Sequence, residues 1–144
     1  MDTSANGLRV LVTAGAAGIG LAITRVFLEH GAQAHICDID DKALAAAKAA
    51  LPGVTQTKAD VASRPDVERL FADAQRALGG LDVLVNNAGI AGPTGKVEEI
   101  APEDWDRCIA IDLSGMFNCT RKAMPLIKAA GGGSIVNLSS AAGR

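Results

Sequence analysis

The chain has 144 residues, enough for one domain that buries roughly two thirds of the surface its unfolded form exposes. Apolar residues make up 49% of the sequence and charged residues 21%, a balance typical of a folded globular protein and not of a disordered one. The net charge is −2 and no block of basic residues is present, so the sequence lacks the usual signature of nucleic-acid or anionic-membrane binding. No apolar run reaches the roughly 18 residues of a membrane-spanning helix.

The cysteines and the N-terminus indicate the compartment. Cys37, Cys108 and Cys119 are odd in number and far apart, which argues against a disulfide framework and against a zinc site. Residues 1–10 have neither the basic start nor the apolar segment of a signal peptide. We therefore expect a cytoplasmic protein with reduced thiols and no bound metal.

Strand-like and helix-like segments alternate from the start of the chain. Residues 8–13 are an apolar run rich in Val and Leu, the pattern of a strand buried on both faces. Residues 19–30 follow with apolar side chains at helical spacing, and Gly31 ends that helix. Residues 34–38 are the second predicted strand, in which His35 is expected to be a packed or edge side chain and not a base.

The alternation continues through the middle of the chain. An alanine-rich helix over residues 41–51 precedes a weaker strand over 54–60. Ser63 and Asp66 form a capping box at the start of the next helix, whose apolar face runs to Leu78. Residues 81–86 are the fourth predicted strand and the most apolar of the set.

A loop over residues 87–101 leads to a long predicted helix over 102–129, which Pro102 opens. Residues 134–140 are the fifth predicted strand. Apolar side chains at steps of three and four along the helix predict a buried stripe, which consists of Trp105, Ile109, Leu113, Met116, Thr120, Met124 and Ile127.

Five strands separated by helices predict right-handed crossovers and a parallel sheet covered on both faces. This is the doubly wound, Rossmann-like α/β fold. No repeat, linker or change of composition divides the chain, so we expect one domain over residues 1–144.

The stretch VTAGAAGIG, residues 12–20, joins the first strand to the first helix. In a parallel sheet, ligands bind beyond the carboxyl ends of the strands. Gly15, Gly18 and Gly20 would let a pyrophosphate approach the backbone at the helix N-terminus, where free N–H groups and the helix dipole favour an anion. The alternative is a glycine-rich turn that binds nothing.

Asp38 ends the second strand, close to the spacing of about 20 residues after the glycines that is expected for the acidic residue on the adenosine ribose. A carboxylate there accepts a bond from the ribose 2′-OH and repels a 2′-phosphate, which favours NAD over NADP. The alternative is that Asp38, Asp40 and Asp41 form only an acidic turn, in which Asp40 is the expected helix cap.

Five motifs in one order point to a known family. VTAGAAGIG, CDID, ADV (59–61), VNNAG (85–89) and GSIVNLSSAAG (133–143) resemble the motifs of the short-chain dehydrogenase/reductases over essentially the whole chain. The resemblance implies an NAD-dependent oxidoreductase that transfers a hydride between nicotinamide and the carbon of a small alcohol or ketone. It also assigns Thr13 and Ile19, with the three glycines, to cofactor binding.

The resemblance further assigns residues to the two ends of the cofactor. Asp60 and Val61 would flank the adenine ring, whereas Asn87, Ala88 and Gly89 would lie close to the nicotinamide ribose. The residue pattern agrees, because a polar Asn-Asn-Ala-Gly after a buried strand is costly unless the amides find partners. An ordinary strand-end turn is the alternative.

In this family a serine at the end of the fifth strand binds the substrate oxygen. Ser140 matches that position, and alternation along 135–140 would turn Ser139 to the opposite face. The alternative is that both serines only satisfy a turn.

Two positions depart from the family pattern. Ala14 stands where the family has the first glycine of its motif, and its methyl group is expected to tighten the turn. Asp112 stands where the family has an asparagine that helps hold a water in the proton relay. We expect Asp112 to be partly buried and hydrogen-bonded, either as a catalytic group or as a carboxylate satisfied by nearby backbone.

The sequence contains no tyrosine, although the family uses a Tyr-x-x-x-Lys segment as its acid/base. Lys122 and Lys128 precede the serine strand and cannot replace that lysine. We therefore expect the N-terminal part of a longer enzyme, without the C-terminal strands and helices of the family, with an open edge at residues 134–140 and no turnover of its own. Two alternatives are a non-catalytic NAD-binding module and an interaction protein. Helix 102–129 is the expected homo-oligomer contact.

Overall fold

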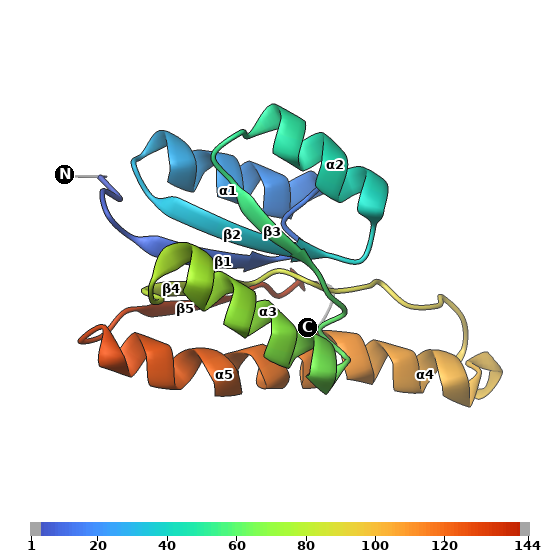
Figure 1. The fold of residues 1–144 in the computed structure, drawn as a ribbon. Helices are drawn as coiled ribbons and strands as arrows, with labels where there is room; N and C mark the ends of the chain where they lie inside the picture. The colour runs from blue at the N-terminus through green and yellow to red at the C-terminus, as the bar shows by residue number, and fades with distance from the viewer. Residues whose placement is uncertain (1–3, 142–144) are drawn as a thin grey trace.

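The computed structural model describes residues 4–141, so residues 142–143 of the fifth motif lie outside the described part. Five strands lie in one sheet (Figure 1): β1 (Arg9–Thr13), β2 (Gln33–Asp38), β3 (Thr55–Lys58), β4 (Val83–Asn86) and β5 (Ser134–Asn137). The α-helices are α1 (Gly18–Glu29), α2 (Asp41–Ala50), α3 (Arg64–Leu78), α4 (Pro102–Cys108) and α5 (Gly115–Ala129). A short 3-10 turn, η1 (Val97–Glu99), precedes α4, and a π-helical segment, η2 (Ile109–Ser114), joins α4 to α5.

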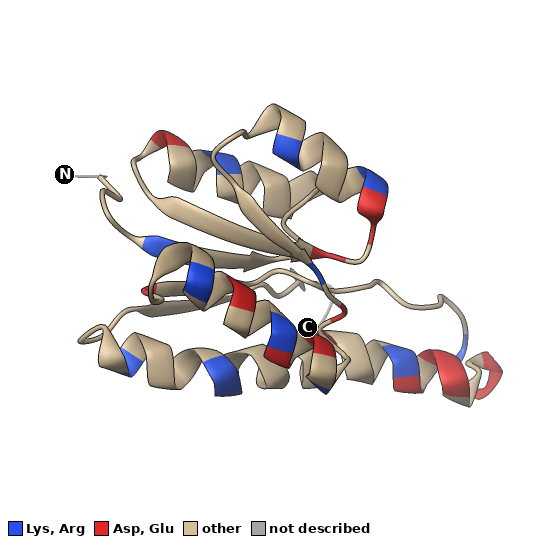
Figure 2. Ribbon diagram, viewed as in Figure 1, with Lys and Arg blue, Asp and Glu red and all other residues tan. Residues whose placement is uncertain are grey.

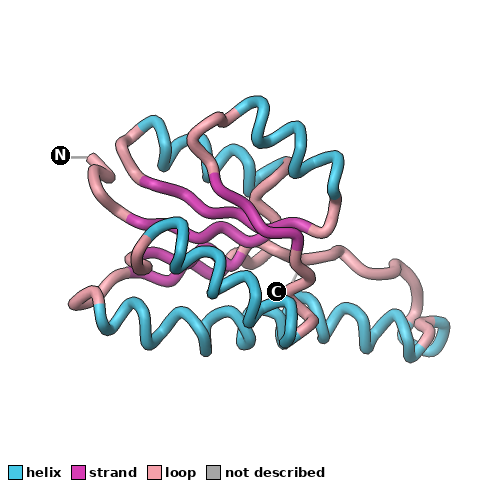
Figure 3. The backbone as a smooth tube through the Cα atoms, viewed as in Figure 1, coloured by secondary structure: helices cyan, strands magenta, loops and turns pink. Residues whose placement is uncertain are grey.

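The sheet has the strand order β3-β2-β1-β4-β5, and every neighbouring pair is parallel. Helices α1 and α2 cover one face, and α3 and α5 cover the other, so that the sheet lies between two helical layers (Figures 1 and 3). The predicted doubly wound α/β fold is confirmed. The chain runs from β1 outward to β2 and β3 on one side and then returns past β1 to β4 and β5 on the other side, and this switch point is where folds of this kind bind ligands.

Each face of the sheet has its own hydrophobic core. Val10 and Val12 point to the side of α1 and α2, whereas Leu11 between them points to the side of α3 and α5. All three side chains are fully buried, because successive residues of a strand face opposite sides and both sides are covered. This explains why the first strand reads as a continuous apolar run.

The predicted long helix exists, but its buried face is different from the predicted stripe. Trp105 and Leu113 are 61% and 62% exposed, and of the predicted stripe only Ile127 is fully buried. The buried residues of α5 are Gly115, Asn118, Cys119, Ala123 and Ile127. The stripe fails because α4 projects beyond the sheet (Figure 1), and because the wider π turns of η2 rotate the faces of α4 and α5 relative to each other.

Strand β5 is shorter than predicted, because it ends at Asn137 and not at residue 140. It pairs only with β4 and forms one edge of the described sheet, and Val136 on it is 45% exposed. The expected open edge at the fifth strand is therefore present.

Charge is unevenly distributed along the segment from η1 to α5. Acidic residues lie on η1 and at the start of α4, whereas the charged residues of α5 are all basic (Figure 2). Within residues 4–141, no helix combines the length and the apolar character needed to cross a membrane.

Candidate cofactor and substrate site at the switch point

The ends of β1 and β4 are joined by hydrogen bonds in both directions. The Thr13 hydroxyl oxygen accepts bonds from the backbone N–H groups of Asn87 and Ala88, at 3.0 and 2.9 Å. The Asn87 side-chain amide donates back to the carbonyl oxygens of Thr13 and Ala14, at 3.0 and 3.1 Å. Thr13 is itself buried, at 1% exposure. The polar residues after the fourth strand thus find the partners that the sequence requires.

The three predicted glycines have different structural roles. A Cβ on Gly15 would lie 2.7 Å from Cγ2 of Ile36, and a Cβ on Gly20 would lie 2.1 Å from the carbonyl oxygen of Ala14. Gly15 and Gly20 therefore permit close packing within the protein. Gly18 has a φ of +53°, and a Cβ on it would meet no atom within 4 Å. Gly18 is thus the glycine of the motif that borders open space.

Ala14 adopts a left-handed backbone conformation, with a φ of +48°. It is the one residue other than glycine with a positive φ in the described part of the chain. The family pattern has glycine at this position, and the structure supplies the physical reason, because a side chain here costs about 1 kcal/mol. The expected tight turn is therefore formed with the alanine under strain.

The N-terminus of α1 is uncapped, unlike those of α2 and α3. Asp40 caps α2 by accepting from the N–H groups of Lys42 and Ala43, and the Ser63 side chain caps α3. Helix α1 has neither a side-chain cap nor an acidic residue in its first turn. Within residues 4–141, no hydrogen bond satisfies the N–H groups of Gly18 and Ile19. These donors and the helix dipole make this end of α1 suitable for an anion.

A hollow of about 210 Å³, here called the Asp38 hollow, lies on one side of the switch point. It brings together the predicted residues Asp38, Asp60, Val61, Ala88 and Gly89. It is also lined by residues that the sequence did not single out, which include Ile39, Ile90, Arg107 and Ile111. The alternating apolar and acidic residues of CDIDD, residues 37–41, are a sequence signal that could have identified Ile39. No sequence signal points to Arg107.

The Asp38 carboxylate is held by backbone donors at the end of β2. Its Oδ1 accepts from the N–H groups of Ile39 and Asp40 at 2.8 and 3.2 Å. Its Oδ2 has only a long bond of 3.4 Å from the N–H of Ala16. One carboxylate oxygen is thus fixed, and the other keeps most of its accepting capacity for a ligand.

Helix α5 holds one wall of the Asp38 hollow. The buried side chain of Asn118 donates from Nδ2 to the carbonyl oxygen of Val61 at 3.0 Å. A Cβ on Gly115 would lie 2.6 Å from Cγ2 of Val61, so that only glycine allows this approach. Sequence reasoning missed both residues, although a glycine inside a helix is a signal of close packing.

A second hollow of about 580 Å³, here called the Asp112 hollow, lies on the other side of the switch point. It brings together predicted site residues from four parts of the chain, namely Ile19, Asn87, Ala88, Gly89, Asp112 and Ser140. Ser139 lines it as well. Since β5 ends at Asn137, strand alternation does not reach the two serines, and the argument that separated Ser140 from Ser139 does not apply.

Asp112 lies in the π-helical segment and is half-buried. Its Oδ1 accepts from the N–H of Ile90 at 2.8 Å, and a Cβ on Gly89 would lie 3.3 Å from the same oxygen. The expectation of a shielded, hydrogen-bonded carboxylate is met. The bond holds the start of the loop after β4 against the long helix.

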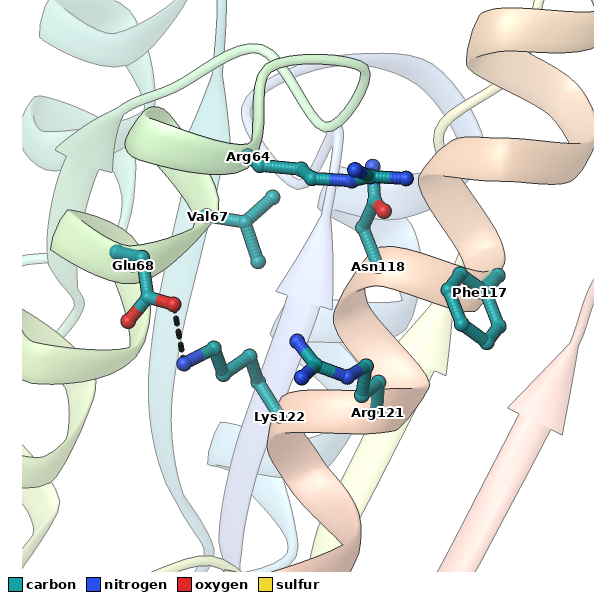
Figure 4. A pocket seen from close by; sticks show the side chains of 7 residues that line it. All are labelled: Arg64, Val67, Glu68, Phe117, Asn118, Arg121 and Lys122. Carbon is teal, nitrogen blue, oxygen red and sulfur yellow. Dashed lines mark ion pairs between the residues drawn. The ribbon is translucent and has the colours of Figure 1, made fainter.

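A third hollow, of about 260 Å³, lies between α3 and α5 and contains none of the predicted site residues (Figure 4). Lys122 of α5 forms an ion pair with Glu68 of α3 across it. Arg64, Phe117 and Arg121 complete its rim. Because helices and not strand ends form it, this hollow is separate from the switch point.

The remaining candidate groups lie in the interior. His35 on β2 is 2% exposed, and its Nδ1 and Nε2 lie 2.7 and 2.8 Å from the hydroxyl oxygens of Thr55 and Thr57. Burial lowers the pKa of His35 to about 4, against a smaller opposing effect of Asp73. Burial raises the pKa of Cys119 to about 12. In the described part of the chain, no three His, Cys, Asp or Glu side chains gather as metal ligands would.

The chain is similar in sequence to several known dehydrogenases. The chain is 36% identical to the L-fucose dehydrogenase of Bos taurus over 143 residues, which are 99% of this chain and 53% of that protein. It is 37% identical to the D-beta-hydroxybutyrate dehydrogenase of Cupriavidus necator, and 35% identical to the 2-dehydro-3-deoxy-L-rhamnonate dehydrogenase (NAD(+)) of a Sphingomonas strain; each match covers 96% of this chain and 55% of the relative. The chain thus spans about half the length of the curated relatives it matches.

Solved structures and family models lead to the same group. A short-chain dehydrogenase structure from Novosphingobium aromaticivorans superposes with a TM-score of 0.88 at 30% identity, over 96% of this chain and 54% of that one. The model of the short chain dehydrogenase family matches residues 9–144. That match includes both strand ends of the switch point and the serine motif. The chain belongs to the short-chain dehydrogenase family, and its relatives are oxidoreductases.

Proposed function

We propose that this domain binds NAD across the carboxyl ends of β1, β2 and β4 and serves a hydride transfer between nicotinamide and a small alcohol or ketone. The observation that carries the proposal is the uncapped start of α1, where Ile19 lines the Asp112 hollow and the preceding Ala14 lines the Asp38 hollow. The free N–H groups of Gly18 and Ile19 would bind the pyrophosphate. The two hollows would then take the two nucleoside halves.

The charges of the Asp38 hollow support NAD over NADP. Asp38 would accept the 2′-OH of the adenosine ribose through the oxygen that backbone donors leave accessible. A 2′-phosphate at the same place would meet the charges of Asp38 and Asp60. Val61 would form the apolar wall beside adenine. The proposal therefore assigns the adenosine half to this side.

The Asp112 hollow would take the nicotinamide half and the substrate. Bound NAD supplies the carbon that accepts or donates the hydride. Asn87, Ala88 and Gly89 would lie beside the nicotinamide ribose, and Ser140 would hold the substrate oxygen. Asp112 would support a proton relay or only fix the loop through Ile90. Thr13, Gly15 and Gly20 would shape the floor without contacting the reacting atoms.

The domain needs an acid/base group for turnover, and its sequence has no tyrosine. Since the chain spans about half of its relatives, we infer that it is the cofactor-binding part of a longer cytoplasmic enzyme, and that the acid/base group lies outside these 144 residues. The second candidate is a non-catalytic NAD-binding module, which the missing tyrosine favours. Both candidates predict NAD binding, and only the first predicts turnover in a chain with the additional segment.

We also propose that the segment from α4 to α5 mediates homo-oligomer formation. Trp105, Leu113 and Phe117 leave an apolar stripe exposed on it. Acidic residues lie at the start of α4, and basic residues such as Arg121 lie on α5 (Figures 2 and 4). Antiparallel packing of two copies would cover the stripe and pair opposite charges. Leu113→Glu should then shift the mass measured by analytical ultracentrifugation toward the monomer.

Calorimetric titration with NAD and NADP tests the cofactor proposal on the 144-residue chain. NAD should bind more tightly than NADP. Asp38→Asn keeps an acceptor oxygen but removes the negative charge that strengthens its hydrogen bond, so it should weaken NAD by about tenfold and reduce the preference over NADP. Asp41→Asn is the matched control, because Asp41 is exposed and pairs with Lys58. Failure of the wild-type chain to bind either dinucleotide would refute the proposal.

A further inference from the structure

Arg107 lies in the last turn of α4 and lines the Asp38 hollow together with residues from the strand ends. Among the described residues that line this hollow, it is the single cation. Ile111, four positions later, lines the same hollow, whereas Trp105 is on the exposed stripe. One face of the segment is thus turned to the hollow and another to solvent.

The guanidinium of Arg107 is uncommitted. Within residues 4–141, no side-chain hydrogen bond or ion pair joins it to another residue. The two carboxylates that share the hollow already accept backbone donors: Asp38 from Ile39, and Asp60 from Ala62 at 2.9 Å. Its donors and its flat face therefore remain available to a ligand.

Two ligand groups could use an arginine in this position. A 2′-phosphate carries between about 1.5 and 2 negative charges near neutral pH, and it would meet one guanidinium against the two carboxylates of Asp38 and Asp60. An adenine ring carries no charge and offers a flat face on which a guanidinium stacks well. The balance of charges in the hollow favours the base.

We propose that Arg107 contacts the adenine ring of the bound dinucleotide from the α4 side, opposite Val61, and contributes affinity that does not depend on the 2′ group. This inference rests on the proposed NAD site. It assigns to α4 a direct part in cofactor binding, in addition to the contact surface on its exposed face.

The test uses isothermal titration of the 144-residue chain with ADP-ribose, NAD and NADP. Arg107→Ala should weaken ADP-ribose and NAD by about tenfold each, which is the size of one stacking contact. NADP should weaken by a similar factor, so that the preference stays the same. Arg107→Lys keeps the charge without the flat face and should recover only part of the affinity. Arg121→Ala removes an exposed arginine from the third hollow and should change nothing.

Three results would overturn the inference. In the first, the wild-type chain binds ADP-ribose and Arg107→Ala binds it with an affinity within twofold of the wild type. This result would show that Arg107 is not part of the site and would leave the proposed function intact. A loss confined to NADP would show that Arg107 binds a phosphate and not the base. A wild-type chain that binds none of the three ligands would refute the proposed function itself, and the inference with it. Circular dichroism of each variant checks that the fold is retained.

Discussion

Thr13 and Asn87 hold the ends of β1 and β4 together at the switch point. The Thr13 hydroxyl oxygen accepts the backbone N–H of Asn87 at 3.0 Å, and the Asn87 side chain returns a bond of 3.0 Å to the Thr13 carbonyl oxygen. The two residues are 74 positions apart in sequence. This reciprocal pair fixes the floor between the Asp38 and Asp112 hollows, so that a change in it should affect both stability and binding.

Thr13→Val tests this relationship, because it keeps the shape of the side chain and removes the hydroxyl group. Two half-buried N–H groups, those of Asn87 and Ala88, would lose their acceptor. We expect a loss of about 2 kcal/mol in the free energy of unfolding and weaker NAD binding. Urea denaturation and calorimetry measure the two effects. Thr13→Ser restores the hydroxyl and should recover most of both, and a valine variant as stable as the wild type would disprove the role.

The glycines of the motif should respond unequally to alanine. Gly20→Ala should prevent the native fold or shift the melting temperature downward by many degrees, because its Cβ would lie 2.1 Å from the Ala14 carbonyl oxygen and 2.5 Å from Nδ2 of Asn87. Gly18→Ala meets no atom and should cost only the strain of its φ of +53°, about 1 kcal/mol. Gly53→Ala is the control, because a Cβ on Gly53 would meet no atom within 4 Å. Equal melting temperatures for the three variants would contradict this ranking.

Ala14→Gly should stabilise the protein by about 1 kcal/mol, because glycine adopts the φ of +48° found at this position without strain. The substitution also restores the glycine of the family pattern. Ala22→Gly, at an exposed position inside α1, should have the opposite sign and a similar size. Chemical denaturation of both variants provides the comparison. Destabilisation by Ala14→Gly would mean that the left-handed turn at residue 14 does not form in solution.

The fold could be predicted from the sequence because each strand and helix has its own local pattern, and these patterns recur along the chain. The run over residues 8–13 predicts a strand buried on both faces, the glycines follow at its end, and Ser63 and Asp40 cap the helices as expected. Parallel order then follows from the alternation of strands and helices. For the same reason the sequence alone assigns Asp38, Asp60 and Asn87 to strand ends.

The parts that could not be predicted depend on contacts between distant segments. Helical periodicity cannot reveal that residues 109–114 widen into a π segment, and so it predicts a buried Trp105, although this side chain is exposed. The bond from Asn118 to Val61 spans 57 positions. Arg107 reaches the Asp38 hollow only because the last turn of α4 lies beside it. Each of these depends on tertiary placement and not on a local pattern.

Asp112→Asn and Asp112→Ala separate the two roles left open for this carboxylate. Asparagine keeps an acceptor oxygen for the N–H of Ile90, so we expect an unchanged fold. Alanine removes the acceptor and should cost about 1 kcal/mol, with faster hydrogen exchange at the Ile90 amide. NMR-detected exchange reports this amide directly. If the Ile90 amide exchanges as slowly in Asp112→Ala as in the wild type, the hydrogen bond to Asp112 does not hold the loop.

Stability should fall as the pH decreases from about 6.5 to about 4, because of His35. Its pKa is lowered from 6.5 to about 4 by burial, so that in this range the unfolded chain binds a proton that the folded protein does not. The stabilising contribution is therefore complete above pH 6.5 and is lost as the pH falls through the folded value. The full shift corresponds to roughly 3 kcal/mol.

The neutral form of His35 has a defined place in the sheet. Thr57 donates to Asp73 at 2.8 Å, so that its oxygen is left to accept from Nε2–H of His35. Urea denaturation at a series of pH values should show a free energy of unfolding that decreases from about pH 6.5 to about pH 4. This decrease should disappear in His35→Gln and persist in His30→Gln, since His30 is the exposed member of the two histidines. Asp82, whose pKa is lowered by its bond to Arg9, acts in a separate range below its ordinary value of 3.8. A wild-type chain whose stability is constant between pH 7 and 4 would show that His35 takes up its proton without cost.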